Sequence, residues 1–294
     1  MGLSMTLASL LLVVLAALCH AIWNLLAKRA ASVGHVFVFA YNLVACAAYA
    51  PWVLYVVAKG GLSWTGMQLG AVLLSGIIHL AYSLCLQRGY QVADLSVVYP
   101  VARGTGPMLS TIGAVVVLGE MPSGRGMVGL ALVVTGIGLI ATGGNLSAFQ
   151  RPGGQAGLRW GAGTGGLIAA YTVVDAFAVK TLGIAPVLLD WFSNTLRFCL
   201  LAPIVLANPA RAMRSMKGFW LNAVAVGLLS PLSYILVLSA LSSGAPLSLV
   251  APLREMSMMV GAVLGMVILR EAVGQGRLLG CAVLIGGVIL LSAA

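Results

Sequence analysis

Charge is what this sequence has least of. Only 7% of its 294 residues are charged and six are acidic, whereas about a quarter of the residues in a typical soluble domain carry a charge. Hydrophobic residues make up 61% of the chain, and the mean hydropathy is +1.08. This composition excludes a water-soluble globular protein and indicates a chain that lies in a lipid bilayer.

The usual signatures of enzymes and cofactor sites are also missing. The chain has no GxxxxGK[ST] loop for nucleotide phosphates and no GxSxG, HExxH or paired catalytic aspartate motif. Its five cysteines lie singly in apolar runs without CxxC spacing, and its sixteen Lys and Arg residues form no basic block. We therefore expect no cofactor, no metal site, no nucleic-acid partner and no enzymatic activity.

Long apolar runs take the place of these features. A run of about 20 residues crosses a hydrocarbon core as a helix, and continuous apolar character favours helices over a barrel. The first run lacks a basic segment before it, so we expect it to remain as a helix. The ten runs are 5–27, 34–57, 66–87, 94–118, 124–143, 160–180, 186–207, 218–240, 246–269 and 275–293. The sequence predicts an all-α polytopic membrane protein with ten transmembrane helices.

The second half of the chain repeats the first. An offset of 152 positions aligns several polar and helix-breaking residues, and with a slip of one residue, to 151, Glu120 aligns with Glu271. The pairs at the first offset include Asn42 with Asn194, Tyr82 with Tyr234, Ser96 with Ser248, and Pro100 with Pro252. We expect a five-helix repeat over 1–145, a loop over 146–159 and a second repeat over 160–294. An odd number of helices in each repeat makes the second an inverted copy of the first.

Two motifs occur once in each repeat. A proline stands early in the fourth helix, in SVVYP and SLVAP, and a glutamate stands at its end, in LGEMPSGRGMVG and LREAVGQGRLLG. Over its whole length the chain resembles the EamA-type members of the drug/metabolite transporter superfamily. The string LCHAIWNLLAK is similar to members associated with phosphonate utilisation. The resemblance implies a secondary transporter in the cell (inner) membrane, with both termini cytoplasmic.

The positive charges indicate the opposite orientation. Lys and Arg residues in the loops after odd-numbered helices outnumber those after even-numbered helices by ten to three. The former are Lys28, Arg29, Arg88, Arg151, Arg159, Arg211, Arg214, Lys217, Arg270 and Arg277, and the latter Lys59, Arg125 and Lys180. The positive-inside rule would place both termini outside. The resemblance and the charge distribution agree only that the two termini lie on the same side of the membrane.

Polar side chains within the apolar runs are the candidate substrate site. The bilayer cannot satisfy them, so they should face the bundle interior, a partner or a water-filled cavity. Several share a helix face, such as Asp190, Asn194 and Arg197. The candidate substrate-binding residues are His20, Trp23, Asn24, Tyr41, His79, Tyr82, Tyr99, Arg103, Tyr171, Asn194, Arg197, Tyr234, Arg254 and Glu255. Asp175, Glu255 and His20 are the candidates for carrying a coupling proton.

Two charges occupy equivalent positions of the repeats, because the offset of 152 aligns Arg103 with Glu255. An ion pair between them would either pin the two halves together or form a gate or part of the substrate site, with Arg254 left to attract an anion. Asp175 has the alternative of a structural partnership with Lys180 or with a polar group of the first helix. Glu120 and Glu271, beside Arg125 and Arg277, are expected to serve packing or topology. Pro100 and Pro252 either break their helices or belong to the first turn.

The mixed charges of this set suit a zwitterion or a small organic anion, such as an amino-acid-like or aminophosphonate-like solute. We expect alternating access, with proton coupling, by a monomer or weak homodimer in the lipid bilayer. The alternative is an exporter or flippase of hydrophobic or quaternary cations or lipid-linked substrates. Such a protein would present an uncompensated acid among aromatic rings. An intramembrane enzyme is the least supported interpretation.

Overall fold

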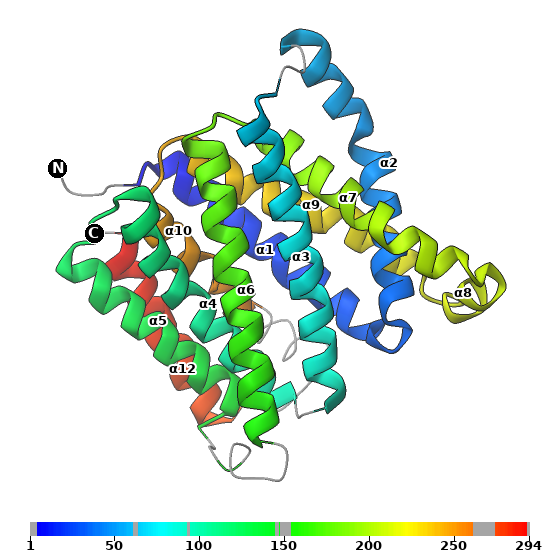
Figure 1. Cartoon of the computed structure of the whole chain (residues 1–294). Coiled ribbons are helices and arrows are strands. Elements are labelled where there is room, and N and C mark those ends of the chain that lie inside the picture. Colours follow the sequence, from blue (N-terminus) through cyan, green and yellow to red (C-terminus); the bar gives the residue numbers. More distant parts are fainter. Residues whose placement is uncertain are drawn as a thin grey trace.

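The chain is almost entirely helical. The computed structural model describes residues 5–60, 64–92, 95–144, 147, 154–260 and 274–292, and no strand occurs among them. The elements are α1 (Leu7–Arg29), η1 (Ala31–Val33), α2 (His35–Gly60), α3 (Gly66–Val92), α4 (Leu95–Leu118), α5 (Gly124–Thr142), α6 (Gly154–Lys180), α7 (Pro186–Leu206), α8 (Pro209–Ser215), α9 (Trp220–Ser242), α10 (Leu247–Arg254) and α12 (Gln275–Ser292). Figure 1 shows them as one bundle of long helices.

Eight of the described helices are long and apolar enough to cross a membrane, and α12 is a shorter apolar helix. Large hydrophobic side chains cover the outside of the bundle; Val116 and Leu221, for example, are 77% and 80% exposed. A surface of this kind suits contact with lipid, because the bilayer core offers no hydrogen-bond partners. The predicted all-α polytopic membrane fold is confirmed, and the helices coincide with the predicted runs within a few residues at most ends.

The predicted ninth helix, 246–269, is not continuous. α10 ends at Arg254, the backbone turns at Glu255, and residues 256–260 are helical again. Pro252 lies inside α10 and has no N–H to donate, and the N–H of Glu255 bonds to the carbonyl of Pro252 in a tight turn. Pro252 therefore precedes a real break in the helix. The rest of this run, including the small-residue pair Gly261 and Gly265, and Glu271 beyond it lie outside the described residues.

Two further boundaries differ from the predicted ones. α6 begins at Gly154, so part of the predicted 146–159 loop is helical. The added first turns carry buried positions, Gly154 and Gly157, and the helix packs closely on α4, since a Cβ at Gly161 would lie 2.9 Å from the carbonyl oxygen of Val98. The predicted loop after α7 contains the short helix α8, whose first N–H groups are capped by the side chain of Asn208.

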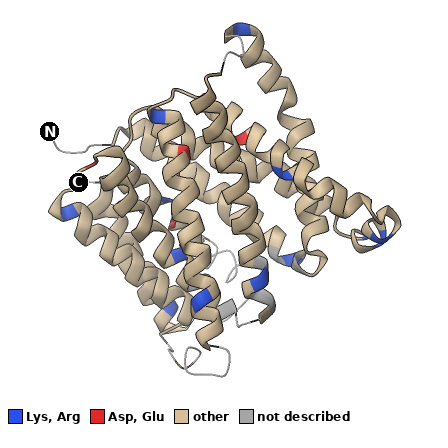
Figure 2. Ribbon diagram, in the orientation of Figure 1, with Lys and Arg blue, Asp and Glu red and all other residues tan. Residues whose placement is uncertain are grey.

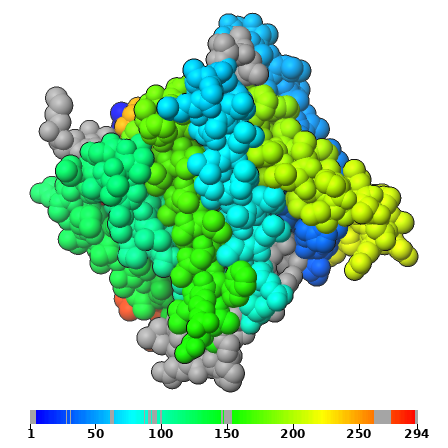
Figure 3. Space-filling view, in the orientation of Figure 1, coloured from blue at the N-terminus to red at the C-terminus, as the bar shows by residue number. Residues whose placement is uncertain are grey.

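The two halves of the chain are interleaved. α1 packs against α9 and α3 against α6, while α2 packs against α7 and α5 against α12. In the predicted repeat, α1 is equivalent to α6, α2 to α7, α3 to α9 and α5 to α12. Exchanging each helix for its equivalent converts the pair α1–α9 into the pair α6–α3. The same exchange leaves the pairs α2–α7 and α5–α12 unchanged. Figure 3 shows the result on one face, where α6 of the second half lies beside α3 of the first.

Glycines bring α5 and α12 into backbone contact. A Cβ at Gly136 would lie 2.8 Å from the carbonyl oxygen of Gly280, and a Cβ at Gly287 would lie 2.8 Å from that of Gly129. An offset of 151 positions aligns Gly129 with Gly280 and Gly136 with Gly287, so each contact joins a glycine to the equivalent of the other. Small residues at such positions let helices approach closely enough for extensive van der Waals contact.

We expect Gly136→Ala to destabilise the protein by about 1 to 3 kcal/mol, because the added methyl group would meet backbone atoms that cannot move aside. Gly138 is the matched control on the same helix, since a Cβ there meets nothing within 4 Å. Gly138→Ala should leave stability unchanged or raise it by about 0.5 to 1 kcal/mol. Thermal unfolding in detergent compares the two variants, and equal losses would contradict the close packing.

Candidate functional site

The buried polar side chains form three groups inside the bundle. The acid–aromatic cluster consists of His79, Tyr82, Tyr171, Asp175 and Tyr234. The arginine cluster consists of Arg103, Arg254, Glu255 and Ser257. The α7 stripe consists of Asp190, Ser193, Asn194 and Arg197. Figure 2 shows how few charged residues the interior holds, with most Lys and Arg near helix ends.

Asp175 is the centre of the acid–aromatic cluster and is completely buried. Its Oδ2 lies 3.0 Å from His79 Nε2 and accepts a 2.5 Å hydrogen bond from the hydroxyl of Tyr234. Its Oδ1 has no hydrogen-bond partner among the described residues. Lys180 pairs with Glu120 instead of Asp175, so the alternative of a partnership between Asp175 and Lys180 is wrong.

Aromatic rings from three helices surround this carboxylate. The ring of Tyr171 on α6 stacks on His79 of α3 with centroids 3.9 Å apart. Tyr234 of α9 meets both rings edge to face, at 5.3 Å from His79 and 6.0 Å from Tyr171, and Tyr82 meets Tyr171 at 5.6 Å. The helices α3, α6 and α9 thus place one buried acid among four rings. The sequence indicated the shared face of Tyr171 and Asp175, but not the convergence of the three helices.

The arginine cluster contains the ion pair that the repeat predicts. Arg103 Nε lies 2.7 Å from Glu255 Oε2, and Arg103 Nη2 donates a 2.9 Å hydrogen bond to Ser257 Oγ. Arg254 Nε lies farther away, 3.8 Å from Glu255 Oε1. All four side chains are buried. Two guanidinium groups therefore share one carboxylate, and the cluster keeps one positive charge in excess.

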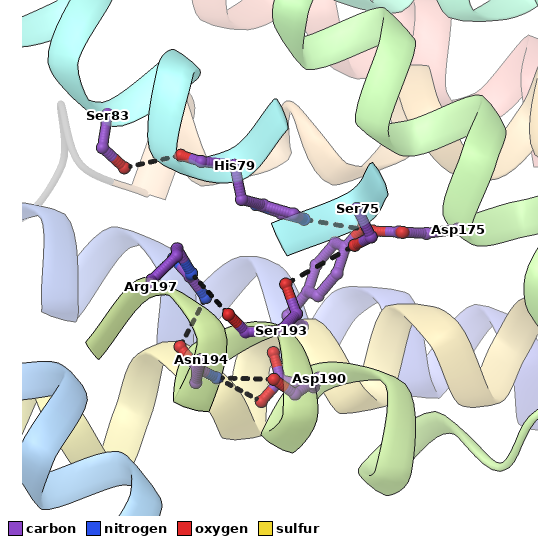
Figure 4. A network of polar contacts seen from close by, with 9 residues as sticks. Ser75, His79, Ser83, Asp175, Asp190, Ser193, Asn194 and Arg197 are labelled. Carbon is purple, nitrogen blue, oxygen red and sulfur yellow. Dashed lines mark hydrogen bonds and ion pairs between the residues drawn. The ribbon is translucent and has the colours of Figure 1, made fainter. Parts of the chain in front are cut away.

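The α7 stripe is a relay of hydrogen bonds along one helix face. Asn194 Nδ2 donates to Asp190 Oδ2 over 2.8 Å, and its Oδ1 accepts from Arg197 Nη2. Ser193 Oγ lies 3.5 Å from Ser75 Oγ on α3. Ser75 stands one turn before His79, and Figure 4 shows the Ser75–Ser193 contact between the stripe and the acid–aromatic cluster.

A fourth polar group, the Glu120 junction, lies where helices end and begin and consists of Glu120 in the loop after α4, Lys180 at the end of α6, and Leu247 and Ser248 at the beginning of α10. Glu120 Oε1 accepts from Lys180 Nζ and the Leu247 N–H, and Oε2 accepts from the N–H and hydroxyl of Ser248, each at 2.8 Å. Burial alone would raise the pKa of Glu120, but the hydrogen bonds from Lys180 and the first N–H groups of α10 outweigh it, and the pKa lies below its usual value. The predicted packing role of Glu120 fits these contacts, although its partner is Lys180 where the sequence suggested Arg125.

The other predicted site residues fall around these clusters. His20 on α1 packs edge to face on Trp23, with centroids 4.8 Å apart, and interacts electrostatically with Arg103 and Arg254. Tyr41 on α2 contacts Phe37 and interacts electrostatically with Arg197. Asn24 is half-buried on α1. The side chain of Tyr99 lies outside the described residues.

Sequence reasoning missed the hydroxyl groups that complete the clusters: Ser75, Ser193 and Ser257. Serine is common in membrane helices, so composition alone does not single these residues out. Their spacing offers one signal, because Ser75 and Ser193 each stand four residues before a selected residue, His79 and Arg197, on the same helix face.

Three comparisons with known proteins bear on identity. Residues 7–142 match the EamA-like transporter family, while no curated protein matches the chain. The solved structures include one, described as "Crystal structure of protein", with a TM-score of 0.73 and 14% sequence identity over 99% of each chain. At that identity the likeness shows a shared fold. The match over residues 7–142 supports membership of the EamA-type drug/metabolite transporter superfamily, whose members are membrane transporters.

Proposed function

We propose that this protein is a secondary transporter of a small zwitterionic metabolite, amino-acid-like or aminophosphonate-like. One observation carries this proposal: a buried acid and a buried arginine each keep an unused polar atom in the same region. Asp175 Oδ1 and Arg254 Nε make no hydrogen bond within the described part of the chain. Arg254 lies within electrostatic range of Tyr171 and Tyr234, two residues of the acid–aromatic cluster. A small solute with both charges would complement both groups.

Arg254 is the proposed ligand of the anionic group. Glu255 lies 2.7 Å from Arg103 but 3.8 Å from Arg254, so the closer arginine is the one that neutralises it. The guanidinium group of Arg254 retains its Nε–H as a donor, and a charged donor of this kind favours a carboxylate or phosphonate as its acceptor. Leaving a buried guanidinium incompletely hydrogen-bonded costs free energy, which an anionic ligand would offset.

The transport cycle we propose is alternating access between the repeats 1–145 and 160–294. The exchange symmetry of the helix pairs supports this mechanism, and so does the Glu120 junction, where the loop after α4 caps a helix of the second half. We also propose that the protein lies in the cell (inner) membrane with both termini on one side. The beginning of α1 and the end of α12 lie at the same edge of the bundle, which supports this arrangement.

Proton coupling is part of the proposal. Asp175 is in contact with His79, and imidazole is the side chain that normally titrates near neutral pH. The pair therefore combines a buried carboxylate with a group able to take up and release a proton. His20 and Glu255 remain further candidates, because His20 lies within electrostatic range of the arginine cluster to which Glu255 belongs.

A second candidate function is export of hydrophobic or quaternary cations. It is favoured by the acid–aromatic cluster, because a buried acid among aromatic rings attracts organic cations. The excess positive charge of the arginine cluster argues against a substrate that carries only positive charge.

The test is a thermal-shift screen of the purified protein in detergent with amino acids, aminophosphonates and quaternary amines. We expect a zwitterionic class to raise the melting temperature of the wild type and Arg254→Ala to lose this response. The variant should still fold, because Glu255 keeps its pair with Arg103. Arg214→Ala, which removes an exposed arginine on α8, is the matched control and should respond like the wild type. Stabilisation by quaternary cations alone would favour the second candidate function.

A further inference from the structure

We infer that Asp175 binds a primary ammonium group of the substrate through its Oδ1, so that the transporter selects primary amines over their quaternary analogues. This inference rests on the proposed transport function and narrows its substrate class. Three features of the site support it: the carboxylate oxygen without a described hydrogen-bond partner, the aromatic rings around Asp175 and the positive charges nearby.

The unused oxygen is the first argument. Both described hydrogen-bond partners of Asp175, His79 and Tyr234, contact Oδ2. Oδ1 has no hydrogen-bond partner among the described residues, although the side chain is completely buried. A buried carboxylate oxygen without a donor is unfavourable, and each such atom in a native structure calls for an explanation. A ligand N–H would supply the missing donor, and a positively charged donor makes the stronger hydrogen bond.

The rings supply the second argument. The side chains of Tyr171, Tyr234 and His79 come from three helices and pack on one another around the acid. Tyrosine faces attract cations within about 6 Å of the ring centroid, most strongly where water is excluded.

Neighbouring positive charges provide the third argument. His79 interacts electrostatically with Arg197 of α7 and Arg254 of α10, besides Asp175 of α6, and it contacts Tyr171 and Tyr234. A substrate carrying only positive charge would meet repulsion from these two arginines. A substrate whose ammonium group is joined to an anionic group would not, because Arg254 would interact with the anion.

Selectivity for the primary amine follows from hydrogen bonding. A quaternary nitrogen keeps the charge but has no N–H, so it leaves Oδ1 unsatisfied on binding. Sites built to hydrogen-bond a substrate N–H discriminate strongly against analogues without it. Removing the nitrogen altogether loses both the hydrogen bond and the charge.

The experiment measures binding by isothermal titration to the purified full-length protein in detergent. The probes are 2-aminoethylphosphonate and alanine, their N-trimethyl analogues, and their deamino analogues ethylphosphonate and propionate. We expect each primary amine to bind at least about tenfold more tightly than its trimethyl analogue. Asp175→Asn should abolish this preference, whereas the control variant Tyr55→Phe, at an exposed tyrosine on α2, should retain it.

Phenethylamine and its trimethyl analogue complete the series, so that this inference and the proposed function can fail separately. A trimethyl analogue that binds as well as the primary amine would overturn the inference while leaving zwitterion transport in place. A preference for primary amines seen only with phenethylamine would support the ammonium site and refute the zwitterionic substrate. Absence of binding by every primary amine would overturn both. The wild-type comparisons decide these outcomes even if Asp175→Asn does not fold.

Discussion

Glu255→Met is expected to lower the free energy of unfolding by about 3 to 5 kcal/mol, the largest effect that we predict for a single substitution. The substitution removes the buried carboxylate that Arg103 and Arg254 both contact, so that the two buried guanidinium groups no longer share this counter-ion. Burying an uncompensated charge costs more than the ion pair itself contributes. Thermal and denaturant unfolding of the detergent-solubilised protein measure the loss.

A double-mutant cycle measures the interaction free energy between Arg103 and Glu255 separately from the cost of leaving buried charges unpaired. Arg103→Met alone should cost about 3 kcal/mol, near the lower end of that range, because Arg254 remains 3.8 Å from Glu255. The double variant Arg103→Met with Glu255→Met should be more stable than Glu255→Met alone, because it buries one fewer unbalanced charge. Arg125→Met, an exposed substitution, is the control. Additive losses in the double variant would show that the two residues do not act as a pair.

Glu120→Gln is expected to cost about 2 kcal/mol, because the neutral amide cannot accept all four hydrogen bonds or balance Lys180. The N-terminus of α10 also loses the negative charge that complements its dipole. Loss of this cap should loosen the contact between the loop after α4 and the second half. Thermal unfolding at pH 7 measures the cost, and Lys180→Met should lose less, since the N–H groups of α10 keep their acceptor.

The pH dependence of stability provides a separate signature of the Glu120 junction. Glu120 has a lower pKa in the folded protein than its ordinary value of 4.5. Its contribution to stability is therefore complete above about pH 4.5 and is lost as the pH falls through the lower, folded-state pKa. The wild type should lose stability in this acidic range, and Glu120→Gln should lose less. Parallel curves for the two proteins would assign the acid sensitivity to another group.

The sequence predicted best those features of the structure that the lipid bilayer restricts most. A lipid core cannot hydrogen-bond the backbone, so apolar runs of sufficient length must form helices, and eight described spans follow from that rule. The same rule directs Asp175, Arg103 and Glu255 into the interior, where the structure has them. The offset of 152 positions also aligned Arg103 with Glu255 and thereby predicted their ion pair.

Other features depended on packing. The sequence suggested Lys180 as a partner of Asp175, because the two residues are close in the chain. In the structure Lys180 reaches Glu120, and Asp175 contacts His79 and Tyr234 from other helices. The helix break at Glu255 has a partial local signal in Pro252. The sequence did not decide whether this proline breaks the helix or lies in its first turn.

The sequence by itself therefore determined the membrane class, the helical spans and the set of polar residues that must avoid lipid, and it predicts an internal duplication. Only the tertiary structure decided which of these residues meet: the acid–aromatic cluster, the sharing of Glu255 by two arginines and the capping of α10 by Glu120. The reason is physical. The period of a helix fixes which of its own residues share a face, but the rotation and shift of one helix against another are set by side-chain packing between segments that lie far apart in the chain.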